Sequence, residues 1–421
     1  MTRDQLGPVQ PDERVQLVDV LRAFALWGIL QVNFAREPWN DVIEFFAAGS
    51  FYPAFSFLFG LGFAIQLIRA AEARRPFVFR YLWRTVILFA IGAAHAMFIW
   101  YGDIVHIYAM LAPVLLLVRR WRGGLLLGLV TLTLVLSMGP RVRAARLVTR
   151  TNPELVEANR LAAARSYQTA LADPPGWCES IPGLTDGYRT HVCNGAVFVR
   201  YEVTRAMTSI EFWRNPSGTA GILPMFLLGL YVGRRRILGD VGAHTRLLVS
   251  VAGAGLAVGL AGNALALFPE YGLVVPRAIW GYNLIGLPGN IGLSLFYLAS
   301  VALLFTHARR ARTVFAPLAY VGRMGLTNYL VQSLVCAALL GWGAGNSIGL
   351  LAGFNAIDRG PDWYRHLLLN GFFVVQIVYS KWWFRRFQFG PVEWAWRSLT
   401  WFRWQPMRAP APAPPTLQPV V

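Results

Sequence analysis

The feature that most limits how this chain can fold is a series of apolar runs of about 20 residues, separated by polar connections. Wound as an α-helix, such a run crosses a hydrocarbon core of about 30 Å. Only 14% of the 421 residues are charged, against roughly 25% in typical soluble domains. Since most runs also lack a polar face, the sequence predicts an all-α, polytopic helical membrane protein and argues against a water-soluble fold.

We expect ten membrane-spanning helices, at residues 15–34, 45–68, 83–101, 104–118, 124–138, 219–233, 247–267, 281–305, 321–343 and 364–384. Arginine clusters occupy alternate connections, as at 234–236 and 309–312. Cytoplasmic loops are enriched in Lys and Arg, so this alternation predicts that both termini are cytoplasmic. It also accounts for the net charge of +18 without nucleic acid, and the expected partner is the lipid bilayer.

A long connection after the fifth span divides the chain. We expect a first bundle of five spans (1–138), an external loop with short helices (139–218), a second bundle of five spans (219–405) and a disordered Pro/Ala-rich tail (406–421). Within the loop, Asn152 and Pro153 are residue types that begin helices, so a short helix is expected there.

Two cysteines, Cys178 and Cys193, lie in the predicted external loop. Because oxidising compartments favour disulfides, this pair is a disulfide candidate that would contribute about 3 kcal/mol in the chain-entropy model. Two unpaired thiols are the alternative. Cys336 stands alone in an apolar segment, where a packing role is expected.

The stretch GAAHAMFIWYGDIVHIYAM (92–110) holds His95, Asp103 and His106 in otherwise apolar surroundings. Ionisable groups inside a membrane cost about 2.5–3.5 kcal/mol each on insertion scales and commonly mark functional sites. A tight hairpin turn would bring Asp103 near the His95 ring, fixing its tautomer and raising its basicity for general-base catalysis. The alternative is a structural histidine bonded to a backbone carbonyl. His106 is expected to face interfacial water.

The first span carries Asp19 and Arg22 at i, i+3 spacing, which places them on one helix face. They form either a self-neutralising pair or a site at which Arg22 holds an anion entering from the cytoplasm. Asn33 lies eleven residues further on, near the outer end of the same helix.

The ninth span has a polar stripe on an apolar helix. Asn328 and Gln332 are four residues apart, as are Tyr329 and Ser333, and Arg323 lies at the cytoplasmic mouth. Such a stripe either lines a cavity or joins helices by hydrogen bonds.

Pro288 and Gly289 lie within the predicted eighth span and indicate a kink at mid-depth. Broken helices also occur in transporters.

Six stretches resemble the YeiB-like family of bacterial membrane proteins, a family with a domain of unknown function. They are VDVLRAFALWGILQVN (18–33), LFGLGFA (58–64), GAAHAMFIWYGDIVHIYA (92–109), FLLGLYVGRRRIL (226–238), VGRMGLTNYLVQS (321–333) and FGPVEWAWRSLTW (389–401). This family is in turn similar to the transmembrane acyltransferases, which share an opening D-x-x-R helix and transfer an acyl group from a cytoplasmic donor to a hydroxyl across the membrane.

The resemblance departs from the pattern at the catalytic histidine. In one acyltransferase branch this histidine closes the first helix, where this chain has Asn33. In another branch it lies in the following external loop, and residues 35–44 contain none. The resemblance therefore implies that His95, beside the "GD" of Asp103, is the first available base.

The leading hypothesis is a transmembrane acyltransferase-like enzyme of the bacterial plasma membrane. His95, oriented by Asp103, would act on a carbohydrate or lipid hydroxyl, and acyl-CoA would be a co-substrate with no metal or bound cofactor. Arg22, set by Asp19, would hold the donor, and the remaining site residues would line the cavity: Asn33, Arg323, Asn328, Tyr329 and Gln332. The alternatives are a transporter or flippase using this cavity, and a non-catalytic partner of an envelope component.

Overall fold

The computed structural model describes residues 16–33, 40–100, 102–150, 171–182, 184, 186–208, 221–267, 286–340 and 362–408. Within these ranges every regular element is a helix, apart from one isolated antiparallel bridge between Phe387 and Arg408. The predicted all-α architecture is confirmed.

A helix occupies each of the ten predicted spans. In chain order they are α1 (Gln16–Asn33), α3 (Phe51–Glu72), α4 (Val78–Phe98), α5 (Val105–Val118), α6 (Gly123–Arg150), α11 (Ile222–Arg234), α12 (Thr245–Leu267), α14 (Gly286–His307), α17 (Gly325–Leu340) and α20 (Asp362–Trp383). By length and composition α3, α4, α12 and α14 can each cross a membrane, and α5, α6 and α11 supply shorter apolar helices. The chain is a multi-pass membrane protein.

Further helices lie between or after these spans. They are α2 (Asn40–Phe46), α8 (Gly176–Glu179), α9 (Asp186–Thr208), α15 (Arg309–Phe315), α16 (Leu318–Arg323) and α21 (Pro391–Trp401).

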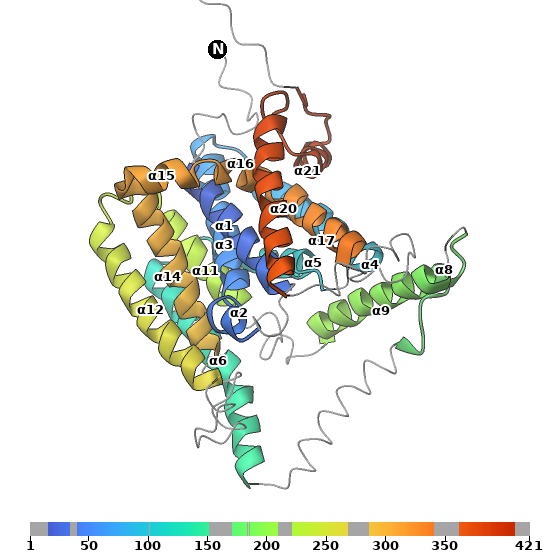
Figure 1. Cartoon of the computed structure of the whole chain (residues 1–421), viewed down its shortest axis with the longest axis horizontal. Coiled ribbons are helices and arrows are strands. Elements are labelled where there is room, and N and C mark those ends of the chain that lie inside the picture. Colours follow the sequence, from blue (N-terminus) through green and yellow to red (C-terminus); the bar gives the residue numbers. More distant parts are fainter. Residues whose placement is uncertain are drawn as a thin grey trace, which may run out of the picture.

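The helix pair α3–α11 meets at glycines. A β-carbon at Gly60 would overlap the Phe226 carbonyl, and a β-carbon at Gly229 would overlap the Phe57 carbonyl. Small residues let membrane helices approach to backbone contact, which strengthens their van der Waals packing. The glycines of LFGLGFA and FLLGLYVGRRRIL therefore hold α3 and α11 side by side (Figure 1).

Helix α1 occupies the centre of the bundle. Figure 1 shows it between the α12–α14 pair on one side and α20, α17 and α4 on the other. Leu21, Leu26 and Leu30 are fully buried, and α16 approaches so closely that a β-carbon at Gly322 would overlap the Asp19 carbonyl. The polar residues of α1 consequently lie among several helices.

The spans differ from expectation in two places, and one prediction about them stays a prediction. The described part of α14 starts at Gly286 and includes Pro288 and Gly289. The residues before Gly286 lie outside the described ranges, so the kink expected at Pro288 stays a prediction. The ninth span is interrupted at Met324, where α16 ends and α17 begins. The fifth span also continues as one helix beyond residue 138, to Arg150.

Helix α9, from the segment 139–218, lies crosswise to α1 and α20 (Figure 1). It packs on the end of α4, where a β-carbon at Gly195 would come within 2.6 Å of the Met97 α-carbon. The helix predicted from Asn152 lies outside the described residues.

Helix α21 packs against the first half of α4, with the Trp396 indole N–H donating to the Arg84 carbonyl at 2.9 Å. After α21 the chain folds back, and the Gln388 N–H donates to the Met407 carbonyl at 3.0 Å. The tail predicted as disordered from residue 406 is therefore ordered as far as Arg408, and residues 409–421 lie outside the described ranges.

Candidate functional site: a carboxylate shared by two histidines

The α4–α5 hairpin is tight because Gly92 has no side chain. A β-carbon there would lie 2.9 Å from Asp103 Oδ2 and would overlap the His106 backbone nitrogen. This close approach folds the turn back on α4, so Asp103 reaches the ring of His95 across the hairpin. The distance from His95 Nδ1 to Asp103 Oδ1 is 2.9 Å, the proximity that the sequence predicted.

Four groups surround the Asp103 carboxylate. Oδ1 lies 2.9 Å from His95 Nδ1 and accepts the Tyr329 hydroxyl at 3.3 Å. Oδ2 accepts the backbone N–H of His106 at 2.9 Å and lies 2.9 Å from His106 Nδ1. An ionised carboxylate only accepts hydrogen bonds, at about four lone-pair sites, so these groups use its full capacity.

This arrangement fixes both histidine tautomers. Because the carboxylate only accepts, each Nδ1 must carry the hydrogen and donate it, which leaves Nε2 of each neutral ring with a lone pair. Both Nε2 atoms are buried and have no hydrogen-bond partner among the described residues. Each is therefore ready to accept a proton from a hydroxyl or an ammonium group.

The sequence predicted that His106 faces interfacial water, and this prediction was wrong. Its exposed fraction is 0%, and its ring meets Phe198 of α9 edge-on at a centroid distance of 5.9 Å. The prediction failed because α9 covers the hairpin from a distant part of the chain. The i, i+3 spacing of Asp103 and His106 was the sequence signal that they share a face.

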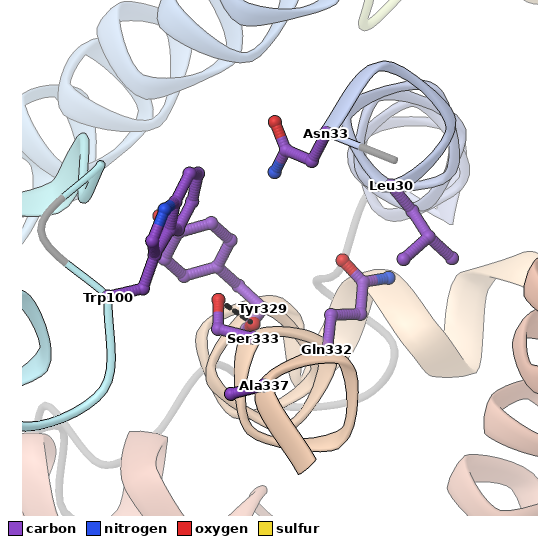
Figure 2. Close-up of a pocket in the computed structure, with 7 residues that line it drawn as sticks. All are labelled: Leu30, Asn33, Trp100, Tyr329, Gln332, Ser333 and Ala337. Carbon is purple, nitrogen blue, oxygen red and sulfur yellow. Dashed lines mark hydrogen bonds between the residues drawn. The ribbon is translucent and has the colours of Figure 1, made fainter. Parts of the chain in front are cut away.

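A small pocket opens beside this cluster, between α1, α17 and the hairpin. It is lined by Leu30, Asn33, Trp100, Tyr329, Gln332, Ser333 and Ala337. Figure 2 shows Asn33 and Gln332 reaching toward the gap between α1 and α17, and Trp100 beside Tyr329 on the other side. His95 is not a lining residue. Its ring lies behind those of Tyr329 and Trp100, at centroid distances of 5.3 and 6.5 Å.

The polar stripe of α17 serves two purposes. Tyr329 and Gln332 line the pocket, whereas Asn328 is fully buried and donates to Ser380 Oγ of α20 at 3.2 Å. Gln376 of α20 joins both, since its amide donates to Asn328 and accepts from Gln332 at 2.9 Å. Asn328 thus joins helices, as the alternative interpretation had it.

The first-span pair lies away from the pocket. Arg22 Nη1 donates to Asp19 Oδ1 at 3.1 Å, with the Arg22 side chain 30% exposed and that of Asp19 buried. Arg84 lies within electrostatic range of two other arginines, Arg22 and Arg397 of α21. Arg323 stacks on the Phe384 ring at 4.0 Å.

Helix α17 is capped by a residue from α21, a feature that the sequence did not reveal. Glu393 Oε1 accepts the backbone N–H groups of Leu326 and Thr327 at 2.7 and 3.0 Å, and Oε2 accepts the Thr327 hydroxyl at 2.5 Å. A carboxylate is favourable at a helix N-terminus. Burial nevertheless raises the pKa of the Glu393 carboxyl above its ordinary value.

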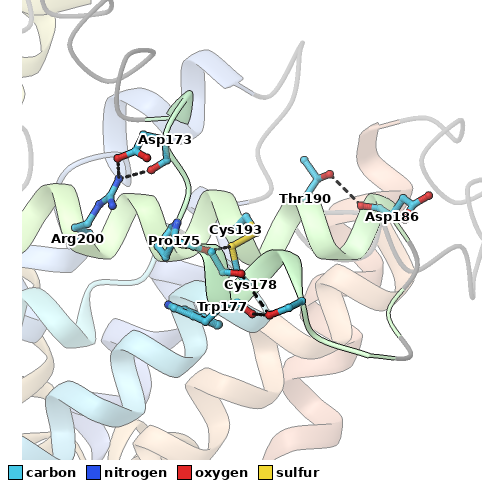
Figure 3. The surroundings of a disulfide bond; sticks show 10 residues. Asp173, Pro175, Trp177, Cys178, Asp186, Thr190, Cys193 and Arg200 are labelled. Carbon is cyan, nitrogen blue, oxygen red and sulfur yellow. Dashed lines mark hydrogen bonds and ion pairs between the residues drawn. A yellow bond between two sulfur atoms is a disulfide. The ribbon is translucent and has the colours of Figure 1, made fainter.

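Cys178 and Cys193 form a disulfide that ties α8 to α9 (Figure 3). Both are buried in a small cluster with Val192, and Arg200 anchors the preceding chain through the Asp173 carbonyl at 2.5 Å. Cys336 is buried in α17. Within the described residues no group of three or more His, Cys, Asp or Glu side chains could hold a metal ion.

Part of this chain matches a known protein family. Residues 232–403 match the family "Protein of unknown function (DUF418)". This stretch, less than half of the chain, is similar to that family of unknown function. That region includes α17, α20 and α21, and the α4–α5 hairpin precedes it.

Relatives extend the similarity beyond that region. Uncharacterized protein YxaH of Bacillus subtilis (strain 168) is 29% identical, over 96% of this chain and 98% of its own length. An uncharacterized 39.9 kDa protein in the amylase 3' region of Bacillus acidopullulyticus is 26% identical, over 94% and 97%. Uncharacterized protein YeiB of Escherichia coli (strain K12) is 37% identical over 100 residues, 23% of this chain and 20% of its own.

Proposed function

We propose that this protein is a transmembrane acyltransferase-like enzyme of the bacterial plasma membrane. It would move an acyl group from cytoplasmic acyl-CoA to a hydroxyl of a carbohydrate or lipid acceptor on the far side. The observation that carries this proposal is the buried contact between His95 and Asp103. Nε2 of His95 has no hydrogen-bond partner among the described residues, and the ring lies next to residues that line a polar pocket.

The chemistry would use His95 twice. As the acceptor oxygen attacks the acyl carbon, its proton moves to His95 Nε2, and the developing imidazolium is stabilised by Asp103. The carbon–sulfur bond then breaks, and the leaving thiolate takes the same proton back. The amides of Asn33 and Gln332 line the pocket and can donate to the oxyanion. Trp100 must move aside for the acceptor to reach His95.

The donor would enter at the other end of α1. Arg22 is eleven residues before Asn33, a rise of about 16 Å along the helix. Arg84 lies within electrostatic range of Arg22, and both Arg397 and the Glu393 carboxylate lie within range of Arg84. Asp19 accepts a hydrogen bond from Arg22. Three arginines against two carboxylates leave a net positive charge, which suits the phosphate groups of an acyl carrier.

The test uses purified protein in lipid nanodiscs with labelled acyl-CoA, measuring hydrolysis and transfer to added acceptors. His95→Asn is the informative variant, because the Asn amide nitrogen can replace Nδ1 toward Asp103 while Nε2 is lost. We expect transfer to fall by at least about 100-fold, the lower range for general acid–base catalysis. His244→Asn, at a helix end outside the site, is the control. A folded His95→Asn protein with full activity would rule out this mechanism.

A further inference from the structure

We propose that His106 is a positioning residue, which holds the Asp103 carboxylate so that His95 keeps its lone pair on Nε2. The kinetic part of this proposal rests on the proposed function, whereas the tautomer part does not. His106 supplies two of the four donors to Asp103, its backbone N–H and its ring Nδ1–H, and both go to Oδ2.

The geometry explains why two donors on one oxygen matter. Asp103 lies in the turn between α4 and α5, so no helical hydrogen-bond ladder holds its backbone on both sides. The two bonds from His106 fix Oδ2, and a planar carboxylate with one oxygen fixed has its other oxygen fixed as well. Oδ1 is thereby held 2.9 Å from His95 Nδ1.

The surroundings of His106 point to this role. Its ring is fully buried against Phe198 of α9, and Gly92 of α4 leaves room for its backbone. The pocket is lined by α1, α17 and Trp100, with no contribution from His106. It therefore acts through Asp103, on the side of the carboxylate opposite His95.

The consequence is a tautomer choice. In water a neutral imidazole can carry its hydrogen on either nitrogen, and the partner of Nδ1 decides which one is used. With Oδ1 held in place, His95 is confined to the Nδ1–H form and its Nε2 remains a base. Without the ring donor of His106, the carboxylate can rotate about its side-chain bonds and this selection weakens.

The test compares His106→Asn with His106→Leu. The Asn amide nitrogen is attached at Cγ, as Nδ1 is, and can still donate to Oδ2. Leu fills comparable space without a donor. Nitrogen-15 NMR of histidine-labelled protein in nanodiscs reports each tautomer, and the chain has six histidines, so His95→Asn assigns the His95 signal by its loss.

In the unmodified protein we expect His95 and His106 both as Nδ1–H tautomers. His106→Asn should leave the His95 signal unchanged, and His106→Leu should give a mixture of the two forms. In the transfer assay His106→Leu should lower kcat on the order of 10–100-fold, as loss of an outer hydrogen-bond partner does, with little change in the acceptor KM.

Three outcomes would overturn the proposal. They are an Nε2–H tautomer on either histidine of the unmodified protein, an unchanged His95 signal in His106→Leu, or equal damage in His106→Asn and His106→Leu. The first is read on the unmodified protein, with His95→Asn and His106→Asn used only to assign the two signals, so it decides the matter even if His106→Leu fails to fold. Full transfer by His95→Asn would instead refute the proposed function and leave the tautomer result standing.

Discussion

Replacement of Asp103 separates the stabilising role of its carboxylate from its chemical role. Asp103→Leu removes all the acceptors from a site where four donors converge, those of His95, His106 (two) and Tyr329. A buried donor left without a partner costs about 1–3 kcal/mol. Four of them give about 4–12 kcal/mol, comparable with the whole stability of many proteins. We expect Asp103→Leu to fold poorly or not at all.

Asp103→Asn should behave differently. If the amide nitrogen replaces Oδ1, His95 can switch tautomer and accept from it, and the Tyr329 hydroxyl can accept as well. The amide oxygen then serves both donors of His106. Stability should fall by much less than in Asp103→Leu, because all four contacts survive without charge. The switched His95 carries its hydrogen on Nε2 and is no longer a base.

The measurement is chemical unfolding in mixed detergent micelles, followed by helical circular dichroism, together with the NMR tautomer readout. Asp186→Asn is a matched control, since the Asp186 carboxylate is 97% exposed and its ion pair with Arg189 is screened by water. The reasoning is refuted if Asp103→Leu unfolds with nearly the unmodified free energy, or if His95 keeps its hydrogen on Nδ1 in Asp103→Asn.

Three further outcomes follow from the fold. Gly60→Ala should lower the free energy of unfolding by about 1–3 kcal/mol, because the added methyl group overpacks α3 on α11. Gly253→Ala is the control and should not destabilise the protein, since a β-carbon at Gly253 meets nothing within 4 Å. Equal effects of the two variants in unfolding titrations would contradict the close glycine contact between α3 and α11. Cys193→Ser should open the α8–α9 region to proteolysis, since a disulfide across a separation of 15 residues contributes about 3 kcal/mol, and an unchanged cleavage rate would count against this. Burial raises the pKa of Glu393 above its unfolded value, so the folded state binds the proton more tightly and stability should fall as pH rises from about 4.5 through the folded pKa. Glu393→Gln should remove that pH dependence. Glu393→Ala should destabilise the protein more than Glu393→Gln, because the N–H groups at the start of α17 lose their acceptor. A pH dependence that survives in Glu393→Gln would assign it to another group.

Much of the local structure could be predicted from the sequence. Each apolar run satisfies its backbone hydrogen bonds internally only as a helix, so every predicted span contains helix in the described residues. The approach of Asp103 to His95 was also predictable, because a short connection between two neighbouring helices leaves the flanking residues few places to go. These are short-range constraints, set by chain connectivity and by the membrane as solvent.

Which faces meet was decided only in the tertiary structure. When a helix is apolar on nearly all sides, its sequence pattern does not show which face packs against which neighbour. Periodicity therefore could not predict that Asn328 faces α20 while Tyr329 faces Asp103. The cap that Glu393 places on α17 and the cover that α9 places over His106 join residues separated by 66 positions and by about 90 positions, respectively. Such pairings depend on the packing of the whole bundle. The sequence by itself determined that this chain forms membrane helices with a histidine and a carboxylate in one hairpin, and the packing of distant helices made that carboxylate the shared, buried partner of two histidines.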